Sequence, residues 1–121
     1  MITKPIQKFP IGIFDSGLGG LTVLTYLEKS LPNESFIYFG DTAHVPYGNK
    51  SADTVIRYSQ RIIEFLLTHN IKAVVIACNT ASAVACQKLR NCYDIPIFDV
   101  VTPSVMHSNN ISITRKIGII G

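Results

Sequence analysis

The chain has 121 residues, a length that fits one domain and is too short for two domains of ordinary size. Hydrophobic residues make up 47% of it and charged residues 16%, which indicates a globular core and more apolar surface than a free-standing domain needs. The formal net charge of +3 comes from scattered basic residues, so the charge pattern does not support nucleic-acid binding.

The longest apolar run covers residues 73–78, far short of the ~20 residues that span a bilayer, and the N-terminus does not resemble a secretory signal. The three cysteines are odd in number and lack metal-ligand spacing with the histidines. We therefore expect a cytoplasmic protein with reduced cysteines, without a metal ion, that binds neither a membrane nor a nucleic acid.

Five short apolar runs predict β-strands, and longer amphipathic segments between them predict helices. The expected strands are residues 10–14, 35–39, 72–77, 96–101 and 116–120. The expected helices are residues 21–31, 51–70 and 80–90, with a short helix or turn at residues 103–109. This alternation predicts an α/β domain with a doubly wound parallel sheet of about five strands and helices on both faces. Residues 1–9 are expected to form an N-terminal extension.

The sequence stops at Gly121, directly after the last expected strand and without a helix to cover that strand. We therefore expect residues 1–121 to be a truncated N-terminal domain, the first of two similar domains of a longer enzyme. The second domain is expected to cover the apolar excess.

Polar residues follow the expected strands and are expected to share one edge of the sheet. They lie at residues 15–16, 41–48, 78–80 and 102–103. Ligands of parallel sheets bind beyond the carboxyl ends of the strands, so this edge is the expected ligand site.

A glycine-rich loop at residues 15–20 (DSGLGG) follows the first strand. A nucleotide phosphate loop is disfavoured, because the third glycine of the dinucleotide fingerprint falls on Thr22 and the lysine of a Walker loop is missing. We expect Asp15 and Ser16 to face a ligand ammonium group, while the helix amides behind them hold a small anion. A tight turn that needs glycine only for its backbone geometry is the alternative.

The loop at residues 38–48 (YFGDTAHVPYG) is long for a compact domain, and long loops are often functional. Tyr47 and the amide of Gly48 can bind a carboxylate in this loop. The alternative is a rigid turn at residues 46–48 with a packed tyrosine ring. His44 by itself indicates no more than a solvated loop histidine.

Cys78 is the strongest candidate for a reactive group. It follows a buried strand and precedes a helix that Asn79 or Thr80 can cap. The partial positive charge at a helix N-terminus favours the thiolate, which is the reactive form of cysteine. A buried structural cysteine is the alternative, and it suits Cys86 within a helix and Cys92 at a helix end better.

Taken together, three segments closely resemble the N-terminal half of glutamate racemase, in the aspartate/glutamate racemase superfamily. They are residues 15–20 (DSGLGG), 38–48 (YFGDTAHVPYG) and 77–82 (ACNTAS), and the likeness runs from about residue 10 to residue 121. The resemblance implies an isomerase that converts L-glutamate to D-glutamate for peptidoglycan synthesis. It also implies a mechanism without a cofactor, in which two cysteines act on opposite faces of the substrate, and a homodimeric complete enzyme.

The resemblance further assigns roles to particular residues. It implies that Cys78 is one of the two catalytic cysteines and that Asp15 and Ser16 contact the substrate near its amino group. Four more residues are then expected to hold the substrate carboxylates, with Pro46 beside them in the substrate-binding loop. These four are Tyr47, Gly48, Asn79 and Thr80.

The second cysteine of the resembled family, followed by Thr-His, lies in a second half that these 121 residues lack, and neither Cys86 nor Cys92 has that context. The chain alone is therefore expected to racemise glutamate poorly. Two alternatives remain. One is an aspartate or other amino-acid racemase of the same superfamily, and the other is a truncated module that binds an amino acid without turnover.

Overall fold

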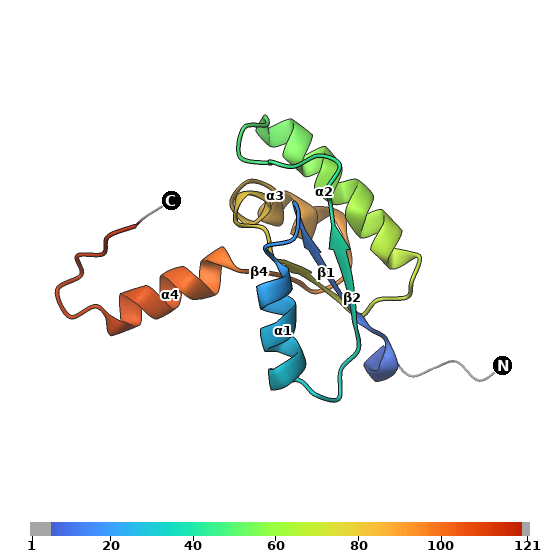
Figure 1. Ribbon diagram of the computed structural model, residues 1–121, viewed down its shortest axis with the longest axis horizontal. Coiled ribbons are helices and arrows are strands. Elements are labelled where there is room, and N and C mark those ends of the chain that lie inside the picture. The colour runs from blue at the N-terminus through green and yellow to red at the C-terminus, as the bar shows by residue number, and fades with distance from the viewer. Residues whose placement is uncertain (1–5, 120–121) are drawn as a thin grey trace.

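A computed structural model of the chain describes residues 6–119 and contains one four-stranded parallel sheet within them (Figure 1). The strands are β1 (Ile11–Asp15), β2 (Phe36–Gly40), β3 (Ala73–Ile76) and β4 (Ile97–Asp99), in the spatial order β2-β1-β3-β4. The helices are the 3-10 turn η1 (Ile6–Lys8), α1 (Leu21–Ser30), α2 (Ala52–Leu67), α3 (Asn79–Cys92) and α4 (Val101–Ile111). The predicted α/β class and parallel sheet are confirmed.

The main hydrophobic core lies between one face of the sheet and the helices α2 and α3, which also pack against each other. α2 begins where the Ser51 hydroxyl accepts a hydrogen bond from the Thr54 amide at 3.2 Å, as its capping residue type predicts. Leu66 of α2 and Leu89 of α3 are completely buried. Each such side chain contributes about 1.5–3 kcal/mol through removal of its apolar surface from water. This packed face holds the sheet rigid.

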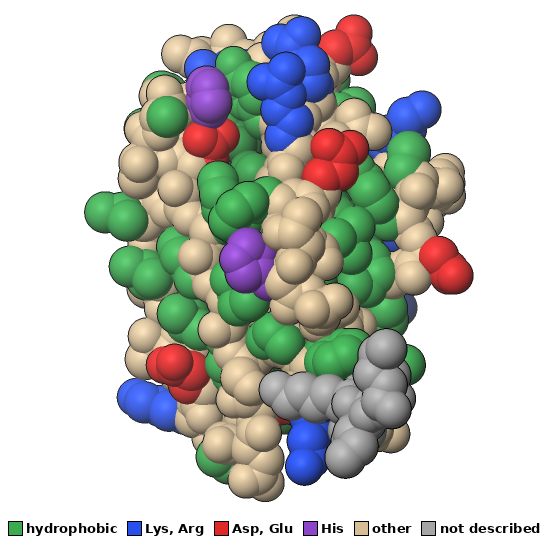
Figure 2. Space-filling view, turned by 90° about the vertical axis from the view of Figure 1, so that its right-hand side faces the viewer, with side chains coloured by type: hydrophobic (Ala, Val, Ile, Leu, Met, Phe, Trp, Pro, Cys, Tyr) green, Lys and Arg blue, Asp and Glu red, His purple; other side chains and the backbone are tan. Residues whose placement is uncertain are grey.

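Among residues 6–119, the helix that covers the opposite face of the sheet is α1, which has no fully buried residue (Figure 1). A groove of about 620 Å³ remains between α1, β3 and β4. Its wall includes Phe98, whose side chain is 57% exposed, and Tyr26, which is 71% exposed. Hydrophobic side chains also reach the surface on another side of the molecule, where they lie among charged ones (Figure 2). The apolar excess of the composition is therefore located partly on the surface.

The strand that the sequence predicts at residues 116–120 is not formed by its described part, residues 116–119. α4 leads away from the sheet and takes the following segment with it, so this segment has no neighbouring strand to pair with (Figure 1). Ile113 and Ile119 are 99% and 92% exposed as a result. Residue 120 and residues 1–5 of the expected N-terminal extension lie outside the described residues.

The fourth strand is shorter than predicted and the helix after it is longer, because α4 already begins at Val101. The cause is Asp99, whose Oδ1 accepts a hydrogen bond from the Thr102 amide at 2.7 Å and so satisfies a free donor in the first helical turn. Pro103 is compatible with this first turn, where a missing amide hydrogen has no helical partner to lose.

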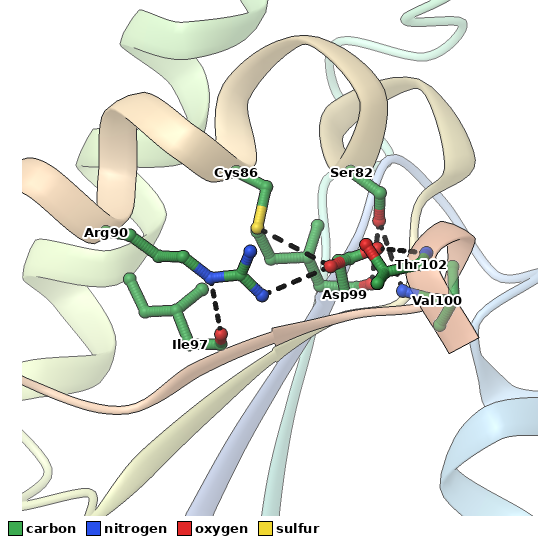
Figure 3. Close-up of polar contacts among 8 residues, drawn as sticks. Ser82, Cys86, Arg90, Ile97, Asp99, Val100 and Thr102 are labelled. Carbon is green, nitrogen blue, oxygen red and sulfur yellow. Dashed lines mark hydrogen bonds and ion pairs between the residues drawn. The ribbon is translucent and has the colours of Figure 1, made fainter. Parts of the chain in front are cut away.

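Asp99 is the centre of a polar network that joins α3, β4 and α4 (Figure 3). Its Oδ2 accepts a hydrogen bond from Arg90 at 3.1 Å and lies 3.8 Å from the Sγ of Cys86. Burial raises the pKa of Asp99, but hydrogen bonds from Thr102 and Arg90 outweigh burial and leave it below its ordinary value of 3.8. Burial is also the main reason why the pKa of Cys86 is raised, so this cysteine remains a thiol. Cys86 is thus a packing residue, as its position in the sequence suggested.

We expect the substitution Asp99→Asn to lower the free energy of unfolding at pH 7 by about 1–3 kcal/mol, because it weakens buried charge-assisted hydrogen bonds. The folded-state pKa of Asp99 is depressed, so its stabilising effect is present above pH 4 and is lost as the pH falls through the folded pKa. Urea denaturation between pH 2 and pH 7 measures both effects. Asp94→Asn, at an exposed turn, is the control. Equal acid sensitivity of wild type and Asp99→Asn would contradict the assignment.

Candidate active site

A cleft of about 560 Å³ opens at the carboxyl ends of β1 and β3. The loop after β1 forms one wall and the start of α3 the other, with residues from the β2–α2 loop and α4 at the rim. Five of the predicted site residues line this cleft, namely Asp15, Ser16, Cys78, Asn79 and Thr80. The other three do not line it, namely Pro46, Tyr47 and Gly48.

Asp15 ends β1 and is 7% exposed. Its Oδ2 accepts hydrogen bonds from the amides of Gly17 and Gly20, each at 3.1 Å. A negative charge in this position also interacts favourably with the N-terminus of α1. The expectation that these amides hold an external anion is therefore wrong, since the carboxylate of Asp15 already occupies them. Its Oδ1 makes no hydrogen bond to the part of the chain that the structure describes and remains free for a ligand donor.

The turn after Asp15 requires a glycine at position 20. A Cβ atom on Gly20 would lie 2.7 Å from the Cβ of Asp15 and 2.9 Å from the Cβ of Ala77, both shorter than any normal contact. Gly20 thus lets the loop after β1 approach the loop after β3. The alternative of a tight turn that needs glycine only for its backbone geometry is therefore partly right. Close packing explains the glycine at position 20, but the turn also holds the carboxylate of Asp15.

Cys78 is itself the N-cap residue of α3, in place of the predicted Asn79 or Thr80. Its backbone is extended, and its Sγ accepts a hydrogen bond from the Ala81 amide at 3.4 Å. The residue is 5% exposed, yet it lines the cleft. Its sulfur thus completes the first turn of α3, at the helix end where the partial charge of the backbone dipole is positive. Because Cys78 takes the capping position, the side chains of Asn79 and Thr80 remain available to the cleft.

Tyr47 is buried in the core, with only 1% of its surface exposed. Its hydroxyl donates a hydrogen bond to Oδ2 of Asp41 at 2.5 Å, and Oδ1 of Asp41 lies 2.7 Å from Nδ1 of His44. Burial and the neighbouring Asp41 carboxylate raise the pKa of Tyr47, so its hydroxyl stays protonated and continues to donate. This arrangement corresponds to the packed-ring alternative. The His44 ring also stacks on Tyr58 at 4.2 Å between centroids, a contact that the sequence did not indicate.

Although neither Tyr47 nor Gly48 lines the cleft, Gly48 lies near a residue that does. A Cβ atom on Gly48 would be 4.0 Å from Oγ1 of Thr80, in ordinary van der Waals contact. The residue of this loop that lines the cleft is Val45, and the buried pair of Asp41 and Tyr47 anchors the loop behind it.

Two structural residues of this region escaped the sequence analysis. Asp41 anchors the loop through two side chains, and Tyr38 donates a hydrogen bond from its hydroxyl to the Gly17 carbonyl at 3.0 Å. Both residues belong to the motif at residues 38–48. Their structural roles became visible only with their hydrogen-bond partners, which lie up to 21 positions away in the sequence. Within residues 6–119, the structure contains no group of three His, Cys, Asp or Glu residues placed to hold a metal ion, and no helix long and apolar enough to cross a membrane.

Comparisons with known proteins agree on one family. Glutamate racemase from Geobacter metallireducens is 51% identical over 111 residues, which are 92% of this chain and 41% of that protein. The structure of glutamate racemase from Aquifex pyrophilus superposes with a TM-score of 0.90 at 46% identity, over 93% of this chain and 45% of that one. The structure of glutamate racemase from Francisella tularensis in complex with D-glutamate superposes with a TM-score of 0.81 at 44% identity. The match covers 87% of this chain and 40% of that one. A scan against models of protein families finds no match.

The proteins that this chain resembles in sequence and in structure are amino-acid racemases. Within that class, the chain is homologous to the N-terminal part of the glutamate racemases. It spans about two fifths of the length of the curated relatives that it matches.

We expect Tyr47→Phe to lower the free energy of unfolding by about 1–3 kcal/mol at pH 7, because Asp41 loses a buried hydrogen-bond donor. The folded-state pKa of Tyr47 is raised, so its stabilising effect is present below pH 10 and is lost as the pH rises beyond that value. The variant should therefore show a smaller alkaline loss than wild type in urea denaturation. Tyr26→Phe, at an exposed side chain, is the control and should leave stability unchanged. Equal stability of the Tyr47→Phe and Tyr26→Phe chains would disprove the anchoring role.

Proposed function

We propose that this chain supplies one half of the active site of a glutamate racemase, with Cys78 as the base on one face of the substrate. The observation that carries the proposal is the shared cleft of Cys78 and Asp15, two groups whose chemistry suits an α-amino acid. The identity of about 50% to glutamate racemases supports glutamate as the substrate, although the chain spans only part of their length.

The placement of Cys78 suits proton abstraction from carbon. The α-proton of an amino acid is weakly acidic, so its removal requires a positioned base in a site that excludes most water. Cys78 is nearly buried, and its Sγ is held by the Ala81 amide at the start of α3. A thiolate at this position takes the α-proton and leaves a carbanion that the carboxylate of the substrate stabilises. A second thiol, from a part of the enzyme outside these 121 residues, returns a proton to the opposite face.

The two walls of the cleft differ in chemistry, and this difference orients the substrate. On the β1 side, Asp15 has Oδ1 free for the ammonium group, and the hydroxyl of Ser16 lies beside it. On the α3 side, Asn79 and Thr80 offer polar groups to the carboxylates. Gly48 lies near Thr80, and we expect its amide to add a further donor. The α-carbon then lies between the walls, next to Cys78.

The wider setting of the proposal follows the family. The enzyme uses no cofactor, works in the cytoplasm as a homodimer of complete chains, and supplies D-glutamate for peptidoglycan. Three free cysteines, one of them exposed, suit a reducing compartment.

We expect Cys78→Ala to reduce deuterium incorporation from solvent at the α-carbon of glutamate by about 10²–10⁴-fold, the usual contribution of a general base. The measurement uses the product of the complete gene and follows the exchange by NMR. Cys92→Ala, at the exposed end of the same helix, is the matched control and should retain wild-type exchange.

A Cys78→Ala protein that binds glutamate and still converts each enantiomer into the other would rule out Cys78 as the base, whereas exchange of one enantiomer alone would be the work of the opposite-face thiol. Binding of glutamate without exchange by the wild-type protein would favour a non-catalytic binding module. Faster exchange of the α-proton of aspartate than of glutamate would favour the alternative of an aspartate racemase.

We expect the isolated 121-residue chain to racemise glutamate at least about 10²-fold more slowly than the complete gene product, because it lacks the opposite-face thiol. Both proteins are assayed by polarimetry at equal molar concentrations. Equal rates would show that these 121 residues contain both bases.

A further inference from the structure

Tyr38 is a residue of β2 that the proposed chemistry does not use. It pairs in register with Ile13 of β1, and its partly buried side chain reaches the loop after β1. There its hydroxyl donates a hydrogen bond to the Gly17 carbonyl at 3.0 Å. Gly17 is the residue whose amide donates to Oδ2 of Asp15. A single residue, Gly17, therefore links the hydroxyl of Tyr38 to the carboxylate that faces the cleft, through its carbonyl on one side and its amide on the other.

The backbone around Tyr38 is packed too closely for any residue but glycine. A Cβ atom on Gly20 would lie 3.0 Å from the Tyr38 hydroxyl oxygen. A Cβ atom on Gly40 would lie 3.2 Å from Cε1 of the Tyr38 ring and only 2.4 Å from the Gly17 carbonyl oxygen. Two chain segments thus pack closely around the Tyr38 side chain and the Gly17 carbonyl. The hydrogen bond is therefore a fixed part of the loop geometry.

The surroundings of Tyr38 place it close to the reactive groups as well. Burial is the main cause of its raised pKa, and the charges of Asp15 and Cys78 raise this pKa further. The hydroxyl is therefore protonated at neutral pH and can act as a donor throughout the working range. Tyr38 does not line the cleft itself, so it acts from behind the loop.

We propose that Tyr38 is a positioning residue that fixes Asp15 for the substrate ammonium group by holding the Gly17 carbonyl. The inference rests on the proposed function and adds a residue to the same site. Without the hydroxyl, the Gly17 backbone can turn about its own Cα atom, and its amide then holds Oδ2 of Asp15 less firmly. The carboxylate then loses the orientation that leaves Oδ1 free in the cleft.

The test is Tyr38→Phe in the product of the complete gene, which keeps the ring and removes only the hydroxyl. We expect KM for glutamate to rise about three- to tenfold, the effect of losing one neutral hydrogen bond, while kcat changes less than about twofold. Amide hydrogen exchange at Gly17 and Gly20 should become faster in the same variant. Tyr26→Phe, which alters an exposed tyrosine of α1, should change neither quantity.

A second variant, Gly40→Ala, displaces the Gly17 carbonyl from the other side and should raise KM in the same way. Faster exchange in Tyr38→Phe with an unchanged KM would assign Tyr38 a structural role only and overturn the proposal. Unchanged exchange at Gly17 and Gly20 would overturn it too. A wild-type protein without glutamate turnover would refute the proposed function instead, and the exchange data would still decide whether Tyr38 holds the loop.

Discussion

The register of β1 against its two neighbours determines which side chains meet at the carboxyl edge of the sheet. Phe14 is paired with Ile76 of β3, and Asp15 with Gly40 of β2. The ladder continues one step further on both sides, through bonds from the Ala77 amide to the Phe14 carbonyl at 2.8 Å and from the Asp41 amide to the Asp15 carbonyl at 2.9 Å. Asp15, Gly40 and Ala77 therefore stand at one level at this edge. A slip by one residue would turn each of them to the other face of the sheet.

The sequence was sufficient to predict which polar residues lie at the carboxyl edge of the sheet. It was not sufficient to predict the hydrogen bonds that these residues make. The apolar runs and the polar residues after them are local signals, and they located Asp15 and Cys78 correctly at the edge of the sheet. The partner of Tyr47 is a carboxylate on the same loop, and whether a tyrosine hydroxyl faces this partner or a ligand depends on the packing of the ring. Capping preferences favour Asn79 and Thr80 over a cysteine, so they could not identify Cys78 as the cap.

The missing fifth strand has a different cause. Residues 116–119 have the composition of a strand, but a strand needs a neighbour with free backbone groups at the right place. Asp99 starts α4 immediately after β4, and this helix directs the chain away from the open edge of the sheet. The course of the chain before this segment, set by the turn after β4, lies outside the window of a periodicity argument.

The helix-capping role of Cys78 ties the proposed chemistry to the integrity of α3. The same sulfur that is to collect the α-proton also completes the first turn of that helix through the Ala81 amide. A neutral thiol accepts a hydrogen bond more weakly than a thiolate does, so the first turn is held most firmly when the base is ready to act and is loosened when it carries the proton. Asn79 and Thr80 belong to that turn. Because these two residues also line the cleft, any change at this one sulfur reaches a whole stretch of the wall.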